Sequence, residues 1–144
     1  MRFLKSPPVQ LGLAILVCEF AGVLGSFFTV SALSSWYEGL MKPTLNPPAW
    51  VFGPVWTVLY ALMGIALFLV WRKETPWKET RVACTLFALQ LFLNTCWSIL
   101  FFGLRNPGAA FAEIIFLWFA IVATVSAFYK ISKPAAWLLV PYVL

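Results

Sequence analysis

The stretch Ala49–Trp71, AWVFGPVWTVLYALMGIALFLVW, runs for 23 residues without a charge. A helix needs about 20 mainly apolar residues to cross the hydrocarbon core of a bilayer. Val82–Leu104 is a second uncharged run of 23 residues, whereas Val9–Leu33 and Asn106–Tyr129 each contain a single glutamate. The sequence therefore predicts four membrane-spanning helices.

The composition of the whole chain supports this interpretation. Of its 144 residues, 62% are hydrophobic and only 10% are charged, which is more apolar surface than a soluble domain of this size can bury. Pro134–Leu144 forms a fifth apolar run of 11 residues, which covers about half a bilayer at about 1.5 Å per residue. A free carboxylate at mid-bilayer is costly, so we expect the chain to stop inside a fifth span. The prediction is an all-α membrane protein, a single domain over residues 1–144, and a five-transmembrane-helix bundle whose fifth helix is truncated in this chain.

Positive charges lie at the edges of these runs. With alternating spans, the side that holds the amino terminus carries eight Lys and Arg residues, and the other side carries only Lys42 and Arg105. Cytoplasmic loops are enriched in such residues. We therefore expect a multi-pass protein of the cell membrane with a cytoplasmic amino terminus and an outer Ser34–Pro48 loop. The connections are short, so consecutive helices should pack antiparallel.

Several functional classes are disfavoured by composition. The chain has no histidine, the commonest metal ligand and acid–base group. Its three cysteines, Cys18, Cys84 and Cys96, fall within spans and form no CxxC pair. We expect no metal site, no required cofactor and no catalytic residues. The net charge of +5 follows from the membrane topology, so no nucleic-acid partner is expected.

The longest connection, Ser34–Pro48, is rich in aromatic residues and prolines. Lys42-Pro43 and Asn46-Pro47-Pro48 would break any long helix there. Long loops of this kind are functional or disordered. The apolar content predicts a lid docked on the outer face of the bundle.

Two spans carry aligned aromatic and amide side chains. In the third span they recur at i, i+4, i+7, i+8 and i+11, which is one helical face; in the second they recur at i, i+4 and i+8. Such faces could line a pocket for a flat, mostly apolar ligand, or they could form a helix–helix seam joined by polar side chains. The residues are Gln90, Asn94, Trp97, Ser98 and Phe101 in the third span, and Phe52, Trp56 and Tyr60 in the second.

Two glutamates lie within spans. Glu19 is near the middle of the first span and shares a face with Gly22, Ser26 and Thr29, so it should point toward other helices. It is either a protonated, hydrogen-bonded group or a proton-coupling residue. Glu113 lies early in the fourth span, where it is either structural or an acceptor at the rim of the pocket.

Five segments of the sequence carry a distinctive set of tryptophan, tyrosine, asparagine and proline residues. They are Trp36-Tyr37-x-x-Leu40-x-Lys42-Pro43, Pro47-Pro48-x-Trp50-x-Phe52, Pro54-x-Trp56-Thr57-x-Leu59-Tyr60, Asn94-x-x-Trp97-Ser98-x-x-Phe101-Phe102-Gly103 and Leu138-Leu139-x-Pro141-Tyr142. These segments resemble the translocator protein / tryptophan-rich sensory protein family. The resemblance implies a five-helix bundle, commonly a homodimer, with an intramembrane pocket beneath the loop between helices 1 and 2. It also implies binding of porphyrins such as protoporphyrin IX, of benzodiazepine-type ligands and, in some members, of sterols.

Carried over by position, the resemblance implies ten ligand-binding residues. They are Tyr37 and Pro47 from the loop, Phe52, Trp56 and Tyr60 from helix 2, and Gln90, Asn94, Trp97, Ser98 and Phe101 from helix 3. Trp56 matches a tryptophan that is linked in bacterial members to light-dependent porphyrin breakdown. The chain stops at Leu144, just before the tryptophan of the family's closing motif.

Three functions are compatible with these observations. The first is a membrane receptor or translocator for porphyrins and related flat apolar ligands, with membrane lipid and a second copy of the chain as partners. The second is light-dependent degradation of bound porphyrin at Trp56. The third is a small proton-coupled exporter that uses Glu19.

Overall fold

The computed structural model describes residues 6–42 and 47–143, which form five α-helices and, within these ranges, no strand. Four helices are long and apolar enough to cross a membrane, and α5 is an 11-residue fifth helix. The prediction of an all-α, multi-pass membrane bundle is confirmed. The helices are α1 (Pro7–Ala32), α2 (Ala49–Trp71), α3 (Trp77–Ser98), α4 (Pro107–Ile131) and α5 (Lys133–Val143).

Proline and asparagine fix where the helices begin. Pro7 opens α1, and Pro48 and Pro76 directly precede α2 and α3, positions where a missing backbone N–H does no harm. Asn106 caps α4, because its side-chain oxygen accepts a hydrogen bond from the Ala109 N–H at 3.0 Å. Arg105, just before this cap, turns the chain with a φ of 52°.

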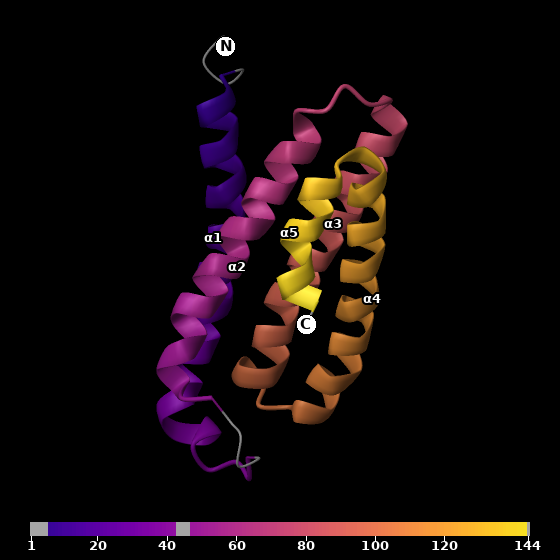
Figure 1. Cartoon of the computed structure of the whole chain (residues 1–144). Coiled ribbons are helices and arrows are strands. Elements are labelled where there is room, and N and C mark those ends of the chain that lie inside the picture. The colour runs from indigo at the N-terminus through magenta and orange to yellow at the C-terminus, as the bar shows by residue number, and fades with distance from the viewer. Residues whose placement is uncertain (1–5, 43–46, 144) are drawn as a thin grey trace.

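The helices close into a ring in an order that differs from the chain order. α1 packs against α2 and α3, α4 packs against α3 and α5, and α5 packs against α2 (Figure 1). The ring therefore runs α1–α2–α5–α4–α3. The expectation that consecutive helices pack on one another holds for α1 with α2, α3 with α4 and α4 with α5, whereas α2 and α3 make only a small contact with each other.

The first span extends further than the sequence indicated. α1 continues as a π-helical turn through Leu33–Tyr37, and α3 continues as a second one through Ile99–Gly103. Trp36 and Tyr37 therefore lie on a helix end rather than in a loop. The connection to α2 is shorter than the predicted Ser34–Pro48, and its residues 43–46 lie outside the described part of the chain.

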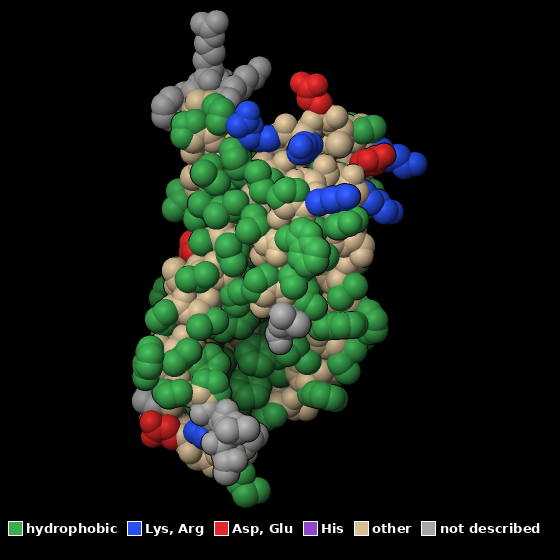
Figure 2. All heavy atoms as spheres, in the orientation of Figure 1, with side chains coloured by type: hydrophobic (Ala, Val, Ile, Leu, Met, Phe, Trp, Pro, Cys, Tyr) green, Lys and Arg blue, Asp and Glu red, His purple; other side chains and the backbone are tan. Residues whose placement is uncertain are grey.

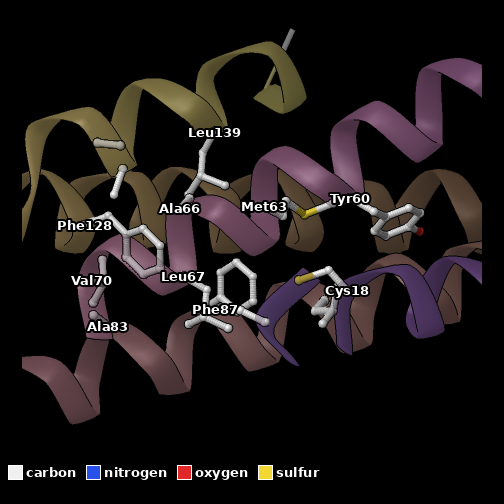
Figure 3. Close-up of a cluster of buried hydrophobic side chains, with 14 of the residues drawn as sticks. Cys18, Tyr60, Met63, Ala66, Leu67, Val70, Ala83, Phe87, Phe128 and Leu139 are labelled. Carbon is white, nitrogen blue, oxygen red and sulfur yellow. The ribbon is translucent and has the colours of Figure 1, made fainter. Parts of the chain in front are cut away.

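A cluster of buried hydrophobic side chains fills part of the interior of the bundle (Figure 3). Cys18, Met63, Phe87, Phe128 and Leu139 come from all five helices and are each at most 3% exposed. The Phe87 and Phe128 rings stack with centroids 5.7 Å apart. This cluster joins the helices on the side of the bundle where α2 ends and α3 begins.

The outer surface is apolar along its length and charged at its ends. Figure 2 shows hydrophobic side chains over most of the visible face, with Lys and Arg gathered mainly at one end. Large side chains such as Leu16, Phe27, Phe92 and Phe116 are each at least 65% exposed. A surface of this kind is expected where lipid is the surrounding solvent.

Candidate ligand-binding site

A cavity of about 220 Å³ lies between α2, α3, α4 and α5. Because its lining includes the last described residues of α5, the cavity borders the carboxyl end of that helix, where Figure 2 shows a hollow among hydrophobic side chains. Three indoles face it, together with aliphatic side chains, one amide and one phenol. The lining residues are Trp56, Asn94, Trp97, Ile114, Leu117, Trp118, Ile121, Tyr142 and Val143.

A chain of hydrogen bonds forms the polar part of the cavity wall. The Tyr60 hydroxyl donates to the side-chain oxygen of Asn94, and the Asn94 amide nitrogen donates to the Tyr142 hydroxyl at 2.9 Å. The Trp56 ring packs against both phenols, at centroid distances of 5.8 Å from Tyr60 and 6.2 Å from Tyr142. Three helices therefore hold the Asn94 amide and the Trp56 indole in fixed positions at the cavity.

An aromatic layer lies behind Trp97 on the side of the π-helical turns. The Trp97 ring stacks on Phe101, with centroids 5.0 Å apart and planes within 8°. Trp36 and Tyr37 then meet Phe101 edge-on at 5.4 and 6.4 Å. Lys42 anchors the layer at its outer side, since its ammonium donates to the Tyr37 carbonyl at 3.0 Å and lies over the Tyr37 ring. The end of α1 thus supports one wall of the cavity.

Five of the ten predicted site residues belong to this arrangement. Trp56, Asn94 and Trp97 line the cavity itself. Tyr60 stands behind Asn94 as its hydrogen-bond donor, and Phe101 stands behind Trp97 as its stacking partner. Tyr37 is not in the cavity lining, and its ring packs on Phe101 and Phe102 at centroid distances of 6.4 and 5.9 Å.

The other predicted residues lie elsewhere. Gln90 is 1% exposed, and its amide nitrogen contacts the Met63 sulfur at 3.8 Å, one layer deeper in the bundle. Ser98 faces α1, because a Cβ placed on Gly25 would lie 3.0 Å from its hydroxyl oxygen. Phe52 is half-buried and Pro47 is exposed, and neither is in the cavity lining. The helical face that groups Ser98 with Trp97 is wide enough for its two edges to meet different neighbours.

The sequence reasoning missed the α4 and α5 walls. Ile114, Leu117, Trp118 and Ile121 recur at i, i+3, i+4 and i+7, which is the spacing of one inward helical stripe. This pattern was present in the sequence and would have indicated an apolar wall. Tyr142 belonged to a matched motif but had no position relative to the other residues until α5 was placed.

The two intramembrane glutamates differ in their surroundings. Both carboxyl oxygens of Glu113 are buried without a hydrogen-bond partner among the described residues, one position before the cavity-lining Ile114. Glu19 is half-buried and lies outside the lining. Its predicted inward face is only partly inward, because Gly22 packs on Tyr60 whereas Ser26 is exposed and bonds its own helix at the Val23 carbonyl. Within residues 6–42 and 47–143, no three potential ligands gather to hold a metal.

Comparison with known proteins agrees with this architecture. Residues 14–144 match the TspO/MBR family. The chain is 48% identical over 136 residues to the tryptophan-rich protein TspO of Chlorobaculum tepidum, covering 93% of this chain and 85% of that protein. It is 42% identical over 120 residues to the human translocator protein (83% and 71%), and 36% identical over 132 residues to the tryptophan-rich sensory protein of Cereibacter sphaeroides (90% and 81%). The resemblance drawn from the motifs is therefore confirmed, and the chain belongs to the TspO/MBR family of multi-pass membrane proteins.

Proposed function

We propose that this protein is an intramembrane receptor or translocator for porphyrins such as protoporphyrin IX, and for related flat apolar ligands such as benzodiazepine-type compounds or sterols. The observation that carries the proposal is the convergence of Trp56, Trp97 and Trp118 on one cavity with a fixed polar edge. Relatives named translocator protein and tryptophan-rich sensory protein support a role in ligand movement or sensing.

The lining chemistry fits a flat ring with few polar atoms. Indole faces stack on aromatic ligands, at about 0.5–1.5 kcal/mol per pair beyond the area buried. The Asn94 amide and the Tyr142 hydroxyl offer a donor and acceptors at one edge. The empty cavity, at about 220 Å³, is smaller than the roughly 300–1,000 Å³ of typical ligand sites. A macrocycle would therefore place only one edge in the cavity.

The protein is proposed to lie in the cell membrane as a single-domain homodimer with its amino terminus in the cytoplasm. The orientation is supported by the charge bias, because the ends of α2 and α4 and the starts of α3 and α5 bring six Lys and Arg residues to one side of the bundle. These are Arg72, Lys73, Lys78, Arg81, Lys130 and Lys133.

The test is a titration of the purified protein with protoporphyrin IX, followed by tryptophan fluorescence. Wild-type emission should be quenched saturably, and Trp56→Leu should weaken affinity by about two- to tenfold, the equivalent of one lost aromatic pair. Trp137→Leu is the matched control, because this α5 indole is 66% exposed and outside the cavity. If a folded Trp56→Leu protein bound protoporphyrin IX as tightly as the wild type, the cavity would not be the porphyrin-binding site.

Two further activities can be separated in the same assay. Light-dependent breakdown is supported by the presence of Trp56 in the lining, and it predicts loss of bound porphyrin under illumination that slows in Trp56→Leu. A proton-coupled exporter needs Glu19, whereas the receptor does not, because Glu19 lies outside the cavity lining. Glu19→Gln should therefore leave porphyrin affinity within about threefold. Gradient-driven dye export that disappears in Glu19→Gln would favour the exporter.

A further inference from the structure

A second hollow lies at the basic end of the bundle, separate from the ligand cavity. It is a groove of about 420 Å³ between the end of α2 and the outer face of α3, and it shares no residue with the ligand cavity. Its walls combine two indoles, a single cation, two hydroxyl groups and small apolar side chains. The lining residues are Trp71, Trp77, Thr80, Arg81, Cys84, Thr85 and Ala88.

The α3 side of the groove is a continuous stripe along the helix. Trp77, Arg81, Thr85 and Ala88 follow one another at i, i+4, i+8 and i+11, so they share one face. At about 1.5 Å per residue, the stripe is about 16 Å long. That length is close to half of the roughly 30 Å hydrocarbon core of a bilayer, so the groove can hold an acyl chain of one leaflet.

The groove opens to the surroundings at the depth where a membrane has its polar boundary. Trp77 is 76% exposed and Trp71 is 46% exposed, and exposed indoles at span ends are typical of the headgroup level. The groove carries its charge near this boundary, at Arg81, and further along it is lined by the uncharged side chains of Cys84, Thr85 and Ala88. This order matches the order of a phospholipid, whose phosphate lies at the boundary and whose chains point inward.

The charge around the groove selects for an anion. Arg81 is the only cation in the lining, and among the described residues its guanidinium forms no ion pair or side-chain hydrogen bond. The segment from Arg72 to Arg81 carries four basic and two acidic residues, Glu74 and Glu79. A guanidinium presents a planar fork that binds phosphate oxygens in pairs.

We propose that this groove is a binding site for one anionic phospholipid, with its phosphate on Arg81 and an acyl chain along Thr85 and Ala88. Basic pockets at the cytoplasmic ends of membrane helices suit anionic headgroups, which are abundant in that leaflet. The proposal is independent of what occupies the cavity between α2, α3, α4 and α5.

The test is native mass spectrometry of the purified protein equilibrated with equal amounts of phosphatidylglycerol and phosphatidylcholine. The wild type should retain one phosphatidylglycerol about fivefold in preference to phosphatidylcholine, the factor expected for one basic residue at the membrane surface. Arg81→Gln should abolish the preference. Lys78→Gln is the matched control, because it removes an exposed cation that is three residues away and not in the lining; it should retain the preference.

A second measurement needs no variant. Phosphatidylglycerol brominated on its acyl chains should quench the tryptophan emission of the wild type more strongly than brominated phosphatidylcholine at the same mole fraction, because Trp71 and Trp77 border the groove. Equal quenching by the two lipids would overturn the proposal.

Four outcomes in the mass spectra would also overturn it. If the wild type showed no preference between the two headgroups, the groove would not be an anion-binding site. An equal loss in Lys78→Gln would assign the preference to the general charge of the surface. Displacement of the lipid by excess glycerol 3-phosphate would indicate a site for soluble phosphates. A dimer without lipid mass, converted to monomer by Arg81→Gln, would show that a second copy of the chain covers the groove.

Discussion

At the scale of single residues, the Asn94 side chain links three helices through hydrogen bonds. Its amide, at 4% exposure on α3, bonds Tyr60 on α2 and Tyr142 on α5. A buried amide that loses its partners, or a hydroxyl that loses the amide, incurs the full desolvation penalty because lipid offers no replacement. Asn94 therefore shapes the cavity and also joins helices that are distant in the sequence.

Replacement of Asn94 by leucine should destabilise the protein by about 1–3 kcal/mol, because both phenols lose their partner. Tyr142→Phe removes only one bond and should be milder, at about 0.5–1.5 kcal/mol. The measurement is thermal unfolding in detergent, followed by helical circular dichroism. In the double variant the Tyr142→Phe effect should largely disappear, since the two residues form one network. Additive effects would contradict a direct bond between them.

At the scale of elements, the α1–α2 contact depends on small residues. A Cβ on Gly64 would lie 2.5 Å from the Ile15 Cα and 2.8 Å from its backbone nitrogen. Backbone cannot move aside as a side chain can, so only glycine permits this approach. Gly22 of α1 similarly lies directly beneath the Tyr60 ring, so the position of α1 also sets that of a phenol in the polar network.

Gly64→Ala should force α1 away from α2 and destabilise the bundle by about 1–3 kcal/mol, the usual range for overpacking. Gly53→Ala is the matched control in the same helix, because nothing lies within 4 Å of a Cβ added there. This control should be neutral or stabilising by up to about 1 kcal/mol, since alanine favours helix. The stability of both variants is measured as the midpoint temperature of thermal unfolding in detergent. A Gly64→Ala protein as stable as Gly53→Ala would disprove the close contact.

At the scale of the whole molecule, charge is segregated along the bundle. Described Lys and Arg residues gather mainly at the end where α2 meets α3 and α4 meets α5 (Figures 1 and 2). Lys42 and Arg105 follow the ends of α1 and α3, at the opposite end of the bundle. The membrane protein should therefore adopt one orientation, with the basic end in the cytoplasm.

Cysteine labelling in intact cells tests this orientation. In a chain whose Cys18, Cys84 and Cys96 are replaced by alanine, Glu38→Cys should react with an impermeant maleimide from outside, because Glu38 is exposed at the end opposite the basic cluster. Lys73→Cys, exposed in the turn between α2 and α3, should react only after lysis. The reverse labelling pattern would show that the basic end of the bundle lies outside the cell.

The sequence by itself determined the membrane class, the four spans and the family. Each of these depends on properties that lie along the chain: the length of an uncharged run, the sign of the charges at its ends and the order of the tryptophan and proline motifs. The solvent dictates such properties locally, because every backbone group in lipid must be bonded within its own helix. Trp56, Asn94 and Trp97 could be chosen for the site on the same basis.

Only the tertiary structure decided which side chains share a space. Helical periodicity places Trp97 and Ser98 on one face, but it does not say that the first meets a cavity and the second meets Gly25 of α1. The cavity walls from α4 and α5 depend on the ring order α1–α2–α5–α4–α3. That order arises from contacts such as Gly64 on Ile15 and Asn94 between two phenols, which join residues far apart in the chain and leave no local periodic signal.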